Sequence, residues 1–138
     1  MTHRETRWWQ PWVVVLALLA LYLAVILAQA GGDAQVFVTL GECFQQCAAH
    51  GGESCPDGTE GYDGQFAYYI ARNPAQSPDC LDVPAYRMQR ILLPATGRLL
   101  SLGQTALIPW AFVAINGAAL VISTALLADL LRTERASR

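Results

Sequence analysis

The sequence predicts an all-α membrane protein in which two transmembrane helices flank an extracytoplasmic loop with short interfacial helices and disulfides. The first observation behind this fold class is a pair of segments, 11–30 and 107–131, that are nearly free of charge. About 20 apolar residues, at 1.5 Å of helix per residue, cross a hydrocarbon core of roughly 30 Å. The second observation is that all four cysteines lie between these segments, where an oxidising compartment would allow them to pair.

Residues 1–10 are predicted to be a cytoplasmic N-terminus. Arg4 and Arg7 precede a cluster of tryptophans at the start of the first span. Basic residues favour the cytoplasmic side, and tryptophans favour the membrane interface. A cleaved signal peptide is the alternative, because Ala28-Gln29-Ala30 has the small-x-small form of a cleavage site. The apolar run exceeds the usual 7–15 residues of a signal core, which favours a retained anchor.

Residues 132–138 are predicted to be a cytoplasmic tail, because they are again rich in arginine. Both termini then lie in the cytoplasm, and residues 31–106 form the extracytoplasmic loop. The lipid bilayer is therefore the first expected partner. Nucleic acid is not expected, because the net charge is -2 and duplex binding usually needs a basic face.

The four loop cysteines are Cys43, Cys47, Cys55 and Cys80. They allow three pairings, and their spacing does not choose among these. We expect two disulfides that brace the loop, including a bond from the 43–55 cluster to Cys80. A Cys₄ zinc site is the alternative, but the spacings lack the paired C-x₂-C form. No metal site is predicted from them.

Two helices are expected within the loop. Residues 65–72 form the first, which ends before Asn73-Pro74 and is aromatic on most sides, as is typical of a segment at a membrane interface. Residues 85–102 form an amphipathic juxtamembrane helix, bent at Pro94. Its polar edge comprises Arg87, Arg90, Gly97, Arg98 and Ser101.

The second span contains Asn116. A polar residue at that depth usually packs against another helix. Other transmembrane helices or subunits are therefore expected as partners.

The best candidate for chemistry is Asp63, in the segment Gly61-Tyr62-Asp63-Gly64-Gln65-Phe66. Glycine permits positive φ and the close approach of a ligand. An acid presented in this way acts as a base, a metal ligand or a simple turn former. Asp-Gly taken alone is more often a turn.

This segment, followed by Tyr68-Tyr69-Ile70-Ala71-Arg72-Asn73-Pro74, Ala85-Tyr86-Arg87-Met88-Gln89-Arg90-Ile91-Leu92-Leu93-Pro94 and Ile108-Pro109-Trp110, resembles one group of bacterial proteins. These are multi-spanning membrane proteins linked to cell-surface glycopolymers and similar to glycosyltransferases of the GT-C class. The resemblance covers residues 61–131 and, more loosely, the first span. It implies an enzyme of the bacterial cytoplasmic (inner) membrane that uses a polyprenyl-phosphate-linked sugar on the outer face.

The resemblance also implies roles for individual residues. A catalytic acid in the first external loop is typical of that class, and Asp63 falls at that place, where it would take a proton from the acceptor hydroxyl. Whether a divalent metal lies near Asp63 stays open. Arg87 and Arg90 would pair with the departing phosphate, and their alternative role is to reach lipid headgroups. Tyr62, Gln65 and Tyr69 would line a sugar site, with packing as the alternative.

Two departures limit the resemblance. Its members have many more spans, and it does not include the cysteine-rich insert before Gly61. We therefore expect an N-terminal portion, a split subunit or a truncated product that is not a competent enzyme by itself. The alternative function is a two-span, disulfide-braced membrane protein that binds a partner or assembles a larger membrane complex.

Overall fold

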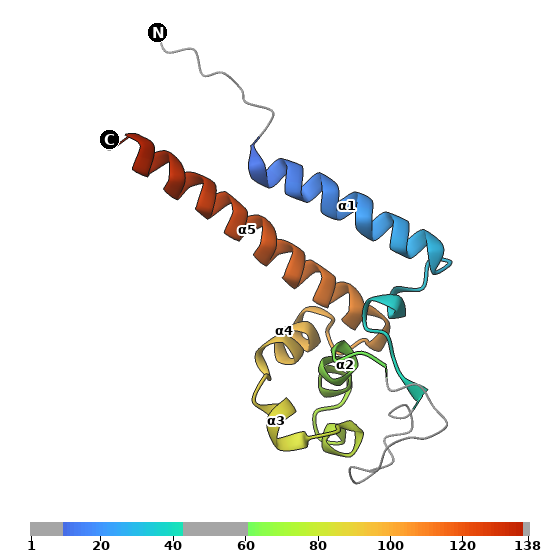
Figure 1. The fold of residues 1–138 in the computed structure, drawn as a ribbon. Coiled ribbons are helices and arrows are strands. Elements are labelled where there is room, and N and C mark those ends of the chain that lie inside the picture. Colours follow the sequence, from blue (N-terminus) through green and yellow to red (C-terminus); the bar gives the residue numbers. More distant parts are fainter. Residues whose placement is uncertain (1–9, 43–60, 137–138) are drawn as a thin grey trace.

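The computed structural model describes residues 10–42 and 61–136. Every regular element in these residues is a helix, and none is a strand. Two long helices lie side by side, α1 (Pro11–Gln29) and α5 (Ile108–Ala136), and three short helices gather at one end of this pair. The described ends of the chain lie together at the opposite end (Figure 1). The all-helical class predicted from the sequence is confirmed.

Both long helices have the length and composition needed to cross a membrane. They cover Pro11–Gln29 and, with the 3₁₀ turn η4 (Thr105–Leu107) included, Thr105–Glu134. Pro11 occupies the first turn of α1, where a missing backbone donor costs nothing. The two helices meet closely at Gly117, where an added Cβ would lie 3.2 Å from Leu19. Asn116 donates to the carbonyl of Phe112 at 2.9 Å, so its amide is satisfied within α5.

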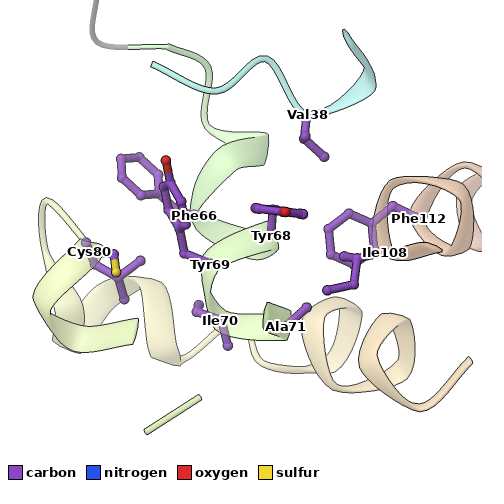
Figure 2. Close-up of a cluster of buried hydrophobic side chains, with 10 residues drawn as sticks. Val38, Phe66, Tyr68, Tyr69, Ile70, Ala71, Cys80, Ile108 and Phe112 are labelled. Atoms are coloured by element: carbon purple, nitrogen blue, oxygen red, sulfur yellow. The ribbon is translucent and has the colours of Figure 1, made fainter. Parts of the chain in front are cut away.

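Helix α2 (Gly64–Arg72) forms the core of the cluster. Six of its nine residues are buried. Its aromatic side chains belong to one buried cluster with Val38, Ile108 and Phe112, and Figure 2 shows Tyr68 on the side of these three residues. The 3₁₀ turns η1 (Ala34–Phe37) and η3 (Ser77–Cys80) lie against α5 and α2 respectively. The predicted helix at 65–72 is confirmed, and its aromatic residues face the interior of the protein. Its position at a membrane interface stays a prediction.

The single helix predicted at 85–102 is wrong, because the structure has two helices there. They are α3 (Pro84–Met88) and α4 (Leu92–Leu100), separated by three residues. Pro94 does not bend a continuous helix. It is the third residue of α4, in the first turn, where a backbone N–H has no intrahelical acceptor. The chain turns before the proline, so that the proline lies where a helix tolerates it.

The polar edge predicted for this region is divided between the interior and the surface: Gly97 and Ser101 are buried, whereas Arg90 and Arg98 stay exposed. In α4 and just after it, the buried residues are Pro94, Gly97 and Ser101. Gly97 lies so close to α5 that an added Cβ would be 2.2 Å from the Phe112 ring. Arg98 extends toward α2 and donates to the carbonyls of Ala71 and Arg72 at 2.9 and 2.8 Å. A cation at this place satisfies the free carbonyls of a helix C-terminus.

Candidate functional site

The candidate site is built on the residue just before α2, on the link between η3 and α3, and on α3. Asp63 is the N-cap of α2, but its carboxylate makes no cap hydrogen bond to that helix. Instead it accepts a hydrogen bond from Nη2 of Arg87 at 3.0 Å. The side chain of Asp63 is 64% exposed. The carboxylate is therefore held in position by one guanidinium and still open to solvent.

Arg87 is the centre of the site. Its Nε and Nη2 donate to the two carboxylate oxygens of Asp82, at 2.9 and 2.8 Å. This bidentate geometry is the strongest form of an arginine–carboxylate pair. The guanidinium also lies 4.2 Å from the ring centroid of Phe66, so the aromatic face of α2 supports it from one side.

The pKa directions agree with this geometry. The hydrogen bond from Arg87, first among several causes, lowers the pKa of the Asp82 carboxyl. The hydrogen bond to Asp82, with a smaller contribution from Asp63, raises the pKa of Arg87. The three groups thus form one network of two carboxylates around one guanidinium. Asp82 was not among the candidates predicted from the sequence. Its position could have identified it. Asp82 comes just before Val83-Pro84, where α3 begins, and lies five residues before Arg87.

Arg90 lies apart from this network. It bonds to the hydroxyl of Tyr86, and its guanidinium lies 4.7 Å from the Tyr86 ring centroid. Arg90 is exposed, whereas only 13% of the Arg87 side chain is exposed. The sequence placed both arginines on one helical edge. Both guanidinium groups lie near the Tyr86 ring, but Arg87 donates to the two carboxylates and Arg90 to the Tyr86 hydroxyl. Tyr62 is also exposed and lies next to Asp63 in the chain.

Two of the predicted sugar-site residues are buried. Gln65 is 1% exposed, and its Oε1 accepts a hydrogen bond from the backbone N–H of Gly41 at 2.9 Å. Tyr69 is also buried, and its ring stacks edge-on against Tyr68 at 5.9 Å. Both side chains stabilise the cluster, and a sugar on the surface would not reach them without a rearrangement.

The hydroxyl of Tyr69 has no hydrogen-bond partner within the described part of the chain. Burial of this group raises the pKa of Tyr69. A buried polar group without a partner costs about 1–3 kcal/mol. We therefore expect Tyr69→Phe to raise the free energy of unfolding, or to leave it unchanged within about 1 kcal/mol. Denaturant titration of the detergent-purified protein, followed by circular dichroism, measures this change.

Tyr62→Phe is the matched control for this substitution, because Tyr62 is exposed and loss of its hydroxyl should leave stability unaltered. A clear loss of stability in Tyr69→Phe, with no loss in Tyr62→Phe, would show that the Tyr69 hydroxyl has a partner in the folded protein.

The described residues around Asp63 do not fit a metal site. The nearby carboxylate is Asp82, and both acids face the Arg87 guanidinium, which takes the place that a cation would need. Among the residues that the structure describes, no three His, Cys, Asp or Glu side chains form a metal-binding group. Of the cysteines, Cys80 is buried in η3, while Cys43, Cys47 and Cys55 lie outside the described residues. The disulfides stay a prediction.

Comparisons with known proteins give no match: no family model, no curated protein and no solved structure is similar to the chain. The functional assignment therefore depends on the residues and on the geometry described above.

Proposed function

We propose that α1 and α5 cross the inner membrane of a bacterium, with both termini in the cytoplasm and the helical cluster on the outer face. The exposure of the long helices supports this. None of the 19 residues of α1, all of them described, is buried. Large apolar side chains are exposed along α1 and α5, among them Leu18, Leu21, Leu126 and Leu130. A core helix of a soluble protein would bury such a surface, because each exposed leucine forfeits about 1.5–3 kcal/mol of burial free energy.

The contact between α1 and α5 supports a retained first span over a cleaved signal peptide. The helices lie side by side, and Leu19 lies against Gly117. A glycine at a helix–helix contact in a membrane allows the backbones to approach closely. Removal of α1 would leave this surface of α5 uncovered.

For the activity, we infer that the chain is the N-terminal part of a GT-C-like glycosyltransferase that uses a polyprenyl-phosphate-linked sugar for cell-surface glycan synthesis. The observation that carries this proposal is the Asp63 carboxylate, which is exposed, outside the long helices and oriented by Arg87. In the reaction, Asp63 takes the proton of the acceptor hydroxyl while the acceptor oxygen bonds to the sugar and the lipid phosphate leaves.

The two arginines have different parts in this proposal. Arg87 is already bound by Asp63 and Asp82, so it serves to position the base. Arg90 is exposed beside Tyr86 and is the arginine that would meet the departing phosphate. Further transmembrane helices, in the same or another polypeptide, would enclose the lipid phosphate, and the exposed apolar faces of α1 and α5 offer surface for them.

The test of this activity is Asp63→Asn in cells that produce the protein. We expect surface glycan synthesis to fall by roughly 10²–10⁴-fold, the usual contribution of a general base, while the membrane level of the protein stays normal. Glycan is measured on intact cells, and protein by immunoblot of the membrane fraction.

Asp82→Asn is the matched control, because Asp82 binds the same guanidinium but is less exposed. A positioning carboxylate should give a smaller loss than the base itself. Equal losses in both variants would mean that the two acids only hold Arg87, and would contradict the role of Asp63.

The second candidate function is a disulfide-braced two-span module that assembles a larger membrane complex. The exposed apolar faces of the two long helices favour it. Under this alternative Asp63→Asn has no effect on glycan, whereas Cys80→Ser lowers the amount of assembled complex.

A further inference from the structure

We propose that the leucine face of α4 inserts into the outer leaflet of the bilayer and sets the depth of the helical cluster. The leucine face is defined by Leu92, Leu99, Leu100 and Leu102, which are 80%, 71%, 60% and 80% exposed. The proposal rests on the membrane placement of α5 proposed above. Lipid acyl chains cover this face in the proposed arrangement.

The first observation is that α4 is packed with its less apolar side inward. Pro94, Gly97 and Ser101 follow each other at helical spacing and are buried. Arg98, the one charged residue among the nine of α4, turns toward the carbonyls at the end of α2. The opposite face therefore presents leucines without a charge among them. A helix that met water would show the reverse pattern.

The second observation is the depth of α4 along α5. Asp129 is the first acidic residue of α5 and marks the inner end of its uncharged segment. Crossing the hydrocarbon core takes roughly 20 residues. Counted back from Asp129, the span therefore begins near Pro109. Phe112 then lies about 5 Å inside the hydrocarbon boundary, at 1.5 Å per residue. Gly97 touches the Phe112 ring, so α4 lies at the same level. Interfacial helices bury their apolar faces by about 5–10 Å.

The third observation is the continuity of the apolar surface from α4 into α5. Leu107, at the end of η4, and Trp110, in the first turn of α5, are both 42% exposed. Trp110 packs edge-on against Phe37, with the ring centroids 5.8 Å apart. Tryptophan at this place is typical of a membrane interface. Between the helices, Leu102 adopts a φ of 53°, which a leucine rarely does. The backbone is thus strained at a residue whose side chain points outward. Figure 1 shows α4 beside the first turns of α5.

The experiment measures the environment of a nitroxide label on the full chain in phosphatidylcholine and phosphatidylglycerol vesicles. The label is attached to a cysteine introduced by Leu99→Cys, and the protein without this substitution is labelled in parallel to subtract the native cysteines. Collisions with molecular oxygen report lipid, and collisions with a nickel chelate report water. Val83→Cys is the matched control, because Val83 is also apolar and exposed but precedes α3, which lies away from α5 (Figure 1).

We expect the label at Leu99 to collide more with oxygen than with nickel, and the label at Val83 to show the opposite. Nickel access at Leu99 equal to that at Val83 would overturn the proposal. Low access to both reagents would also overturn it, since protein and not lipid would then cover this face. Leu92→Cys repeats the measurement if Leu99→Cys does not fold.

A label at Leu126, exposed on α5, separates this inference from the membrane placement on which it rests. If Leu126 reports lipid and Leu99 reports water, only the depth of α4 is wrong. If Leu126 reports water, the proposed span itself is wrong.

Discussion

Gly61→Ala is expected to lower the free energy of unfolding of the helical cluster by about 2–4 kcal/mol, near the upper end of single-residue effects. Two independent causes add here. Gly61 has a φ of 74°, a conformation that costs an L-residue about 1–2 kcal/mol. In addition, an alanine Cβ would lie 2.4 Å from the backbone nitrogen of Gly41 and 2.7 Å from Oε1 of Gln65.

The second cause matters more, because the obstructing atoms cannot move independently. The Gly41 N–H donates to Oε1 of Gln65, and the Tyr62 N–H donates to the carbonyl of Thr39 at 3.1 Å. These bonds join residues 39–41 to the start of α2. Pushing Gly41 away would break the bond to Gln65 within a buried environment, and a buried polar group that loses its partner costs about 1–3 kcal/mol.

Gly32→Ala separates the two causes. Gly32 has a φ of 89°, with nothing within 4 Å of an added Cβ. It should therefore show the cost of the positive φ alone, about 1–2 kcal/mol. Denaturant titrations in detergent compare the two variants. If Gly61→Ala costs no more than Gly32→Ala, the close approach of Gly61 to Gly41 is not maintained in the folded protein.

The long helices and α2 followed from local composition: uncharged stretches of membrane length, and an aromatic run that ends at Asn73-Pro74. The positive φ of Gly61 also followed from residue type. Gly64 shows the limit of that reasoning, because it begins α2 and does not adopt a positive φ.

The site was predicted only in part because its contacts are between distant residues. Asp63 and Arg87 were both identified as candidates, but their ion pair at 3.0 Å joins residues 24 positions apart, and no local pattern encodes it. Gln65 illustrates the opposite problem. A polar residue near a candidate acid suggested a sugar contact, whereas the fold uses its amide to bind Gly41 inside the cluster.

The orientation of α4 was not predicted because apolar periodicity does not say which environment an apolar face meets. In water the leucines would be buried. The structure instead buries the side with Gly97 and Ser101, and Gly97 was read only as part of a polar edge. The glycine is needed there for its size.

Gly97→Ala therefore provides the second large expected effect, a loss of about 1–3 kcal/mol, the usual cost of overpacking. The added Cβ would lie 2.2 and 2.7 Å from two carbons of the Phe112 ring. Phe112 is buried in the core with Ile108 and Tyr68, so the ring cannot swing into solvent. Either α4 separates from α5 or the ring adopts an unfavourable rotamer. In both cases the loss exceeds the gain of up to about 1 kcal/mol that alanine usually brings to a helix interior.

Gly64→Ala is the matched control, because it also lies in a short helix and an added Cβ would make only ordinary contacts, the nearest at 3.6 Å. It should be tolerated. A double-mutant cycle with Phe112→Leu then tests the cause. Phe112→Leu alone loses packing, but it removes the ring that the alanine meets. The double variant should therefore be more stable than the sum of the two single losses predicts. Strict additivity would mean that Gly97 and Phe112 do not touch in the folded protein. The contact between Gly97 and Phe112 would then no longer support the membrane depth proposed for α4.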